Sequence, residues 1–271
     1  MLRERVLSGL LLGVPVLAMV IIGGHLFTLL ALLVISISSI EFVHLVARRG
    51  HRAFGGLMLL WSALFVAGHL WPESLFIRPC AALLLLLTML WSLARFRQGT
   101  ANAMTGFAMT LAGSFYIGWS GAHFVSLRAL DDGLFWLLTV LGSVWVSDSA
   151  AYLVGRAIGR TPLIPDISPG KTWEGYIGGI VFGTLGGATL PLLWSLLGAG
   201  AEVSPLHGLV IGALSSVVAP LGDFGISMLK RYAGAKNASN LIPGHGGLLD
   251  RIDSLIVAGL LSYYYLILIA L

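Results

Sequence analysis

Charged residues are scarce in this sequence. Only 10% of its 271 residues are charged, while 57% are hydrophobic. A soluble domain carries roughly a quarter charged residues. The apolar residues form long blocks, and because unpaired backbone groups are costly in lipid, such blocks must be helices or strands of a closed barrel. Barrel strands alternate apolar and polar residues, and these blocks do not, so the sequence predicts membrane helices.

Several common structural and catalytic motifs are also missing. The single cysteine, Cys80, excludes an internal disulfide. None of the seven histidines forms a pair at i, i+4 spacing, so no zinc site is expected. The Gly-Lys-Thr that ends at Thr172 is not a P-loop, because Pro165 stands where the first glycine would be. A Gly-x-Ser-x-Gly nucleophile elbow is absent as well.

The apolar blocks predict an all-α, polytopic integral membrane protein. A helix needs about 20 mostly apolar residues to cross the hydrocarbon core, which predicts about nine transmembrane helices. The expected spans are 6–22, 25–46, 54–70, 75–93, 104–127, 133–155, 175–198, 206–229 and 252–271. The first span has no A-x-A-like cleavage site after its apolar run, so we expect it to be a retained helix.

The basic residues predict the orientation of these spans. With the N-terminus in the cytoplasm and the C-terminus in the periplasm, fourteen of the sixteen Lys and Arg residues fall in cytoplasmic segments. They are Arg3, Arg5, Arg48, Arg49, Arg52, Arg95, Arg97, Arg156, Arg160, Lys171, Lys230, Arg231, Lys236 and Arg251. Basic residues in short loops beside the membrane contact anionic lipid. The basic pI is therefore attributed to lipid contact and not to nucleic-acid binding. Compact spans without a long polar tail are typical of a multi-pass protein of the bacterial inner membrane.

We expect residues 1–271 to form a single membrane domain without an internal repeat. Residues 1–130 are loop-poor helices, whereas 131–271 hold the catalytic helices and cytoplasmic loops. The two long loops, 156–174 and 230–251, are rich in Gly, Pro and charge, so the chemistry is expected there.

The most informative run begins in the span 206–229. Asp223, Ser227, Lys230 and Arg231 are spaced i, i+4, i+7 and i+8, so they share one face of a helix. Together with the acids and the Gly-rich loop that follow, this face gives two or three carboxylates beside several cations near the membrane surface. This predicts a Mg²⁺–phosphate site, since Mg²⁺ is held by one or two carboxylates and substrate phosphates. The alternative is that Lys230 and Arg231 only set topology.

The same run continues to the start of the last span. Pro243-Gly-His-Gly-Gly247 offers flexible backbone with exposed N–H groups for phosphate oxygens. Asp250 and Asp253 follow, three residues apart, with Arg251 between them. The structural alternative is that the two acids cap the helix, where the dipole favours them. A cap needs one acid, which favours the functional interpretation.

Asp148 lies within the span 133–155, four residues before Tyr152. An ionisable residue inside a membrane span is costly and therefore a functional candidate. The alternative is an Asp paired with an Arg for packing. Glu41 and His44 in the second span pose the same question, and for them we favour the structural interpretation.

The segment 168–175 reads Ser-Pro-Gly-Lys-Thr-Trp-Glu-Gly. Thr172 followed by Glu174 is typical of a helix N-cap with an acid in the first turn. Lys171, just before that helix, is a candidate phosphate ligand.

The 27 residues from Ser227 to Asp253 resemble the signature of phosphatidate cytidylyltransferases, also called CDP-diacylglycerol synthases. That signature reads S-x-aliphatic-K-R, four residues, K-D, a short gap, P-x-H-G-G, one aliphatic, one residue, and D-R-x-D. The segments 148–152 and 169–175 also look like family segments, in the expected order. Where the family has Lys-Asp, this chain has Lys236-Asn237, so we expect weaker metal affinity, because Asn carries no negative charge.

The resemblance implies that CTP and phosphatidic acid give CDP-diacylglycerol and pyrophosphate. It implies Mg²⁺, with or without a second cation, held by Asp223, Asp250 and Asp253, with Lys230 and Lys236 as further catalytic residues. The residues implied to bind substrate are Asp148, Lys171, Ser227, Arg231, Asn237, His245, Gly246, Gly247 and Arg251. The partners are CTP, phosphatidic acid and membrane lipids, and a homodimer is the ordinary expectation. The alternatives are a proton-coupled transporter with Asp148 and Asp223 as carriers, or a catalytically weak lipid-binding relative.

Overall fold

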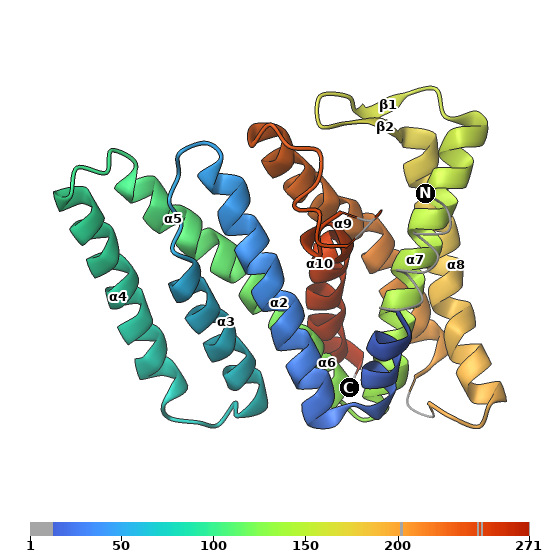
Figure 1. The fold of residues 1–271 in the computed structure, drawn as a ribbon. Coiled ribbons are helices and arrows are strands. Elements are labelled where there is room, and N and C mark those ends of the chain that lie inside the picture. The colour runs from blue at the N-terminus through green and yellow to red at the C-terminus, as the bar shows by residue number, and fades with distance from the viewer. Residues whose placement is uncertain (1–12, 201–202, 243, 245, 271) are drawn as a thin grey trace. The chain divides into compact units, whose positions relative to one another are not determined.

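The computed structural model describes residues 13–200, 203–242, 244 and 246–270. These residues are nearly all helical (Figure 1). After a first helical stretch, Gly13–Ile22, the α-helices are α2 (Gly24–Ala47), α3 (Gly55–Leu70), α4 (Ile77–Arg97), α5 (Ala103–Gly113), α6 (Ser120–Ala129), α7 (Gly133–Ile158), α8 (Trp173–Leu196), α9 (Pro205–Tyr232) and α10 (Leu249–Tyr265). Two π-helical turns, η1 (Ser114–Trp119) and η2 (Leu266–Ala270), and two short strands, β1 (Pro162–Ile164) and β2 (Ser168–Thr172), complete the described part.

Six of the described helices are long and apolar enough to cross a membrane. They are α2, α4, α7, α8, α9 and the continuous run of α10 and η2. This confirms the all-α polytopic prediction, while the count of nine spans and their orientation stay predictions. The expected span 54–70 is a shorter helix, α3, and the expected span 104–127 is a helical run whose middle is the π-helical turn η1. The expected span 6–22 begins outside the described residues.

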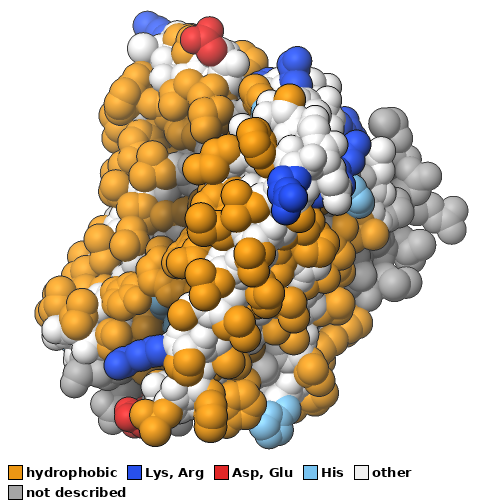
Figure 2. All heavy atoms as spheres, turned by 90° about the vertical axis from the view of Figure 1, so that its left-hand side faces the viewer, with side chains coloured by type: hydrophobic (Ala, Val, Ile, Leu, Met, Phe, Trp, Pro, Cys, Tyr) orange, Lys and Arg blue, Asp and Glu red, His pale blue; other side chains and the backbone are white. Residues whose placement is uncertain are grey.

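The hydrophobic surface of α4 shows why this fold requires lipid. Leu83, Leu86, Met89, Leu90 and Leu93 all expose their side chains along this helix. Figure 2 shows a face of the molecule covered largely by hydrophobic side chains, with few charged ones. Monomeric soluble proteins rarely expose an apolar patch of such extent, whereas a helix that meets lipid tails does so without cost.

The chain folds into two compact units. The first unit comprises Met1–Ser126 and Leu229–Arg251, and the second comprises Leu127–Met228 and Ile252–Leu271. Helices α9 and α10 each carry residues of both units. The sequence-based division near residue 130 stays a prediction.

Small residues allow the helices of the second unit to approach closely. Along α8, Gly175, Gly179, Gly183 and Gly187 recur at every fourth position and are all buried. A Cβ atom at Gly183 would lie 2.0 Å from Ser216 Oγ of α9, and one at Gly187 would lie 2.3 Å from the carbonyl oxygen of Gly208. Backbones pack this closely in membranes through small residues at four-residue spacing.

Between α7 and α8 the chain forms an antiparallel hairpin of β1 and β2, which the all-helical expectation did not include. Prolines in the segment 162–169 lack the N–H that a helix needs, which favours an extended chain here. The Glu174 carboxylate accepts hydrogen bonds from the Arg160 N–H and from the N–H and hydroxyl of Thr161, which ties the hairpin to α8. Thr172 Oγ1 accepts a hydrogen bond from the Gly175 N–H at 3.2 Å, so the predicted N-cap is confirmed.

Candidate functional site

In the second unit, the hairpin carries Lys171 to helix α9. The Lys171 ammonium pairs with Asp223 Oδ2 and lies 4.7 Å from the centroid of the Phe224 ring. The other carboxylate oxygen, Asp223 Oδ1, accepts a hydrogen bond from Ser227 Oγ at 3.1 Å. The Lys171 and Asp223 side chains keep 34% and 24% of their surface exposed, so a ligand can reach this ion pair.

Two further acids of the second unit belong to the same neighbourhood. Asp148 is exposed on α7, within electrostatic range of Lys171 and Asp223. Asp253 is buried on α10, where its Oδ1 accepts a hydrogen bond from the Ser254 N–H at 2.7 Å. A Cβ at Gly222, the residue before Asp223, would lie 2.0 Å from the Asp253 carbonyl oxygen, so α9 and α10 touch through their backbones here.

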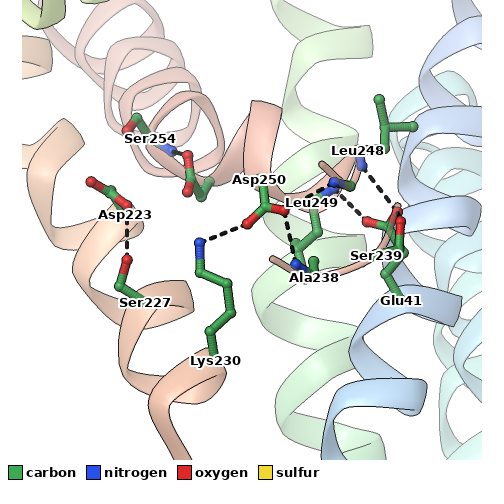
Figure 3. Close-up of polar contacts among 12 residues, drawn as sticks. Glu41, Asp223, Ser227, Lys230, Ala238, Ser239, Leu248, Leu249, Asp250 and Ser254 are labelled. Atoms are coloured by element: carbon green, nitrogen blue, oxygen red, sulfur yellow. Dashed lines mark hydrogen bonds and ion pairs between the residues drawn. The ribbon is translucent and has the colours of Figure 1, made fainter. Parts of the chain in front are cut away.

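The first unit holds a second lysine–aspartate pair, at the end of α9 and the start of α10. Lys230 Nζ donates to Asp250 Oδ1 at 2.6 Å, and only 13% and 7% of the two side chains are exposed. The backbone N–H groups of Ala238 and Gly247 both donate to Asp250 Oδ2, at 2.8 and 3.0 Å. Figure 3 shows Asp250 between the Lys230 ammonium and the chain at Ala238. Both oxygens of this carboxylate therefore have donors.

The loop before α10 brings Asn237 to the same carboxylate. Ile242 and Gly246 exchange two backbone hydrogen bonds, at 2.9 and 3.1 Å, which closes the loop. Gly246 has φ +83°, a left-handed conformation that glycine adopts without strain. A Cβ built on it would lie 3.0 Å from Asp250 Oδ2 and 3.4 Å from Asn237 Cγ. The residue that departs from the family pattern thus lies beside Asp250.

Three basic residues that the sequence places in the site are exposed to solvent. Arg231 lies in the last turn of α9, Lys236 in the following loop, and Arg251 in the first turn of α10. Their exposure suits them to reach a free or lipid phosphate. His245 is outside the described residues.

Glu41 contacts the loop before α10, although it lies outside the family signature. Its buried carboxylate, on α2, accepts hydrogen bonds from Ser239 Oγ and from the N–H groups of Leu248 and Leu249 (Figure 3). These bonds tie Glu41 to the loop and to the start of α10, as a structural role requires, and they do not decide whether it also has a functional one. The signal in the sequence was a carboxylate in the last two turns of an apolar span, but nothing in the sequence identified its partners.

Each unit, taken by itself, has a carboxylate whose chemistry suits Mg²⁺. Two carboxylates, Asp223 and Asp250, already hold ammonium groups, so both face a cation. Mg²⁺ is commonly held by one or two carboxylates together with substrate phosphates and waters. Within the described ranges, no group of three or more His, Cys, Asp or Glu side chains is gathered to hold a metal by itself. A protein-only metal cage is therefore not part of the described structure.

The long apolar helices define an integral membrane protein. Its two lysine–aspartate pairs and its exposed basic side chains are groups that can bind phosphates. The sequence matches the model of the cytidylyltransferase family over residues 3–269, and the chain belongs to this family. This confirms the family resemblance carried by the run from Ser227 to Asp253.

Three relatives illustrate the match. The phosphatidate cytidylyltransferase of Bacillus subtilis (strain 168) is 32% identical over 268 residues, which cover 98% of this chain and 97% of the relative. The phosphatidate cytidylyltransferase of Brucella suis biovar 1 is 33% identical over 272 residues, 97% of this chain and 93% of the relative. The phosphatidate cytidylyltransferase of Synechocystis sp. (strain PCC 6803) is 32% identical over 302 residues, 98% of this chain and 97% of the relative.

Proposed function

We propose that this protein transfers the cytidylyl group of CTP to phosphatidic acid, giving CDP-diacylglycerol and pyrophosphate. The observation that carries the proposal is the similarity to relatives named phosphatidate cytidylyltransferase, which extends over nearly the whole of both chains. The acidic and basic side chains described above supply the chemistry that such a transfer needs.

The reaction is a displacement at phosphorus. A phosphate oxygen of phosphatidic acid attacks the α-phosphorus of CTP, and a new P–O bond forms. The bond from the α-phosphorus to the oxygen that bridges to the β-phosphate breaks, and pyrophosphate leaves with the bonding electrons. Reactions of this kind depend on positioning and on neutralisation of negative charge, more than on covalent catalysis.

In the second unit, Asp223 is the proposed principal metal ligand, because its carboxylate is the more exposed of the two that pair with lysine. Lys171 exchanges Asp223 for a phosphate oxygen when substrate binds. Ser227 orients the Asp223 carboxylate through its hydrogen bond. Asp148 adds negative charge on the side of α7, and Asp253 completes the proposed acidic set.

In the first unit, Asp250 has only Oδ1 available to a cation, since Oδ2 already accepts two backbone hydrogen bonds. Lys230 is the proposed neutralising group at that oxygen. Arg231, Lys236 and Arg251 contact the triphosphate or the lipid phosphate. Asn237 and the loop with His245, Gly246 and Gly247 are proposed to contact CTP. The N–H groups of Gly246 and Gly247 already donate to Ile242 and Asp250, so such contacts use other atoms or require these bonds to be exchanged.

Mg²⁺, with or without a second cation, is the proposed cofactor. Its proposed protein ligands are Asp223 and Asp253 in the second unit and Asp250 in the first. When bound, it neutralises phosphate charge and polarises the α-phosphorus for attack. Replacing a charge-neutral Asn237 by the family Asp would add a carboxylate beside Asp250, as the Gly246 distances indicate.

We propose that the protein is a multi-pass protein of the bacterial inner membrane with its active site toward the cytoplasm. The support is the concentration of Lys and Arg in the segments 48–52, 95–97, 156–171 and 230–251. CTP is a cytoplasmic nucleotide, which agrees with that orientation. A homodimer is the proposed assembly.

The test is an assay of the full-length protein in mild detergent, with labelled CTP, phosphatidic acid and Mg²⁺. We expect CDP-diacylglycerol to form only when lipid and metal are both present. Absence of product with phosphatidic acid, in a preparation that is folded and monodisperse, would overturn the proposal. Product formed with another lipid phosphate, but not with phosphatidic acid, would correct the substrate and retain the chemistry.

A further inference from the structure

A buried carboxylate outside the signature contacts the signature directly. Glu41 lies near the end of α2 and is 4% exposed. Its Oε1 accepts hydrogen bonds from Ser239 Oγ at 2.5 Å and from the Leu248 N–H at 3.0 Å. Its Oε2 accepts a hydrogen bond from the Leu249 N–H at 2.7 Å. The two oxygens therefore have three donors, all from the loop before α10 and from its first turn (Figure 3).

The donors explain why a carboxylate is placed there. The first N–H groups of a helix have no carbonyl partner within that helix. Leu248 immediately precedes α10 and Leu249 is its first residue, so Glu41 satisfies two such groups from a position 207 and 208 residues earlier in the chain. A negative charge is also favourable at the positive end of the helix dipole. Glu41 thus caps α10 from another helix.

The cap is directly connected to Asp250. Three successive backbone N–H groups are divided between two carboxylates: that of Gly247 donates to Asp250, and the next two donate to Glu41. Asp250 follows Leu249 immediately and holds Lys230 at 2.6 Å. A shift of this first turn would therefore move the Asp250 carboxylate and its lysine partner.

Gly247 makes this arrangement sterically specific. A Cβ on Gly247 would lie 2.8 Å from both carboxylate oxygens of Glu41. That distance is shorter than side chains tolerate, so the second glycine of the His-Gly-Gly run leaves the room that Glu41 occupies. The glycine and the acid are complementary parts of one contact.

We propose that Glu41 is a positioning residue of the active site, which holds the first turn of α10 so that Asp250 and Lys230 meet the nucleotide in reactive geometry. The inference rests on the proposed function. Displacements of about 1 Å at a distance from the reacting atoms can lower rates about a hundredfold, so a contact of this kind has a large effect on turnover.

The test replaces Glu41 by Gln, which keeps the shape of the side chain. A Gln side chain has one acceptor oxygen, so its NH₂ group must face the N–H of either Leu248 or Leu249. One buried N–H is then left without an acceptor. Glu73→Gln makes the same chemical change at an exposed carboxylate of the same unit and serves as the matched control.

We expect Glu41→Gln to lower kcat/KM for CTP about tenfold to a hundredfold, while Glu73→Gln stays within about twofold of the wild type. Hydrogen exchange at Leu248 and Leu249 should accelerate. The decisive readout is a double-mutant comparison with Asp250→Asn. If Glu41 acts through Asp250, adding Glu41→Gln to Asp250→Asn should lower activity by no more than about twofold further. Where Asp250→Asn turns over too slowly, equilibrium binding of labelled CTP provides the same comparison.

The outcomes separate this inference from the proposed function. An active wild type with Glu41→Gln within twofold of it would overturn the positioning role alone. So would a double variant that loses the full Glu41→Gln factor in addition to that of Asp250→Asn, since a general loss of stability would act in that way. A wild type without turnover on phosphatidic acid would overturn the proposed function, and this inference with it.

Discussion

The two lysine–aspartate pairs allow one substitution to be compared in two environments. Lys171→Met and Lys230→Met each remove an ammonium group and keep a side chain of similar length. The Lys171–Asp223 pair is about one quarter to one third exposed, whereas the Lys230–Asp250 pair is almost fully buried. The same change should therefore affect stability very differently at the two positions.

The expected magnitudes follow from exposure. A partly exposed ion pair is screened by solvent and contributes about 0–1 kcal/mol, so Lys171→Met should leave stability nearly unchanged. Removing one partner of a buried pair costs about 3–5 kcal/mol, because the remaining charge loses its partner. The two N–H donors to Asp250 remain in Lys230→Met, which places the expected loss near 3 kcal/mol, the lower end of that range. For a chain of this size such a loss corresponds to a Tm shift of roughly 6–12 °C.

The assay is thermal unfolding of each variant in the same detergent, together with turnover of CTP. Both variants should lose activity, but only Lys230→Met should lose substantial thermal stability. The control is a double variant at each site, Lys171→Met with Asp223→Asn and Lys230→Met with Asp250→Asn. In each double variant, the Asp→Asn change removes the charge that the lysine substitution leaves unpaired. Equal Tm shifts for the two single variants would refute the reasoning from burial.

Three further predictions concern single residues. Asp223→Ala should abolish turnover while Tm stays within a few degrees of the wild type, and near-normal turnover would exclude Asp223 as a metal ligand. Gly222→Ala should destabilise the protein by about 1–3 kcal/mol or more, since its Cβ would meet the Asp253 carbonyl oxygen at 2.0 Å; thermal unfolding against Gly170→Ala, where a Cβ meets nothing within 4 Å, measures this, and equal Tm values would contradict it. Asn237→Asp should lower the Mg²⁺ concentration for half-maximal turnover several-fold by adding negative charge beside Asp250; a Mg²⁺ titration checks this, and an unchanged midpoint would show that position 237 does not face the metal.

Much of this protein follows from local patterns in its sequence. Long apolar blocks determine membrane helices, because the backbone in lipid must satisfy its own hydrogen bonds. The i, i+4 spacing of Asp223 and Ser227 predicts a shared helix face, and the hydrogen bond between them confirms it. The Thr172 cap and the family signature are equally local, since both depend on residue types at short, fixed spacings.

Other features depend on the tertiary structure, because they join residues far apart in the chain. The bond between Glu41 and Leu249 spans 208 positions, and no periodicity in the sequence identifies such a pair. The pairing of Lys171 with Asp223, and of Lys230 with Asp250, likewise depends on how the hairpin and the loop fold back onto α9 and α10. The sequence by itself determined the membrane-helical class and the family, because those depend on local composition and spacing. Only the tertiary structure decided which charge meets which carboxylate, because that depends on the packing of distant segments.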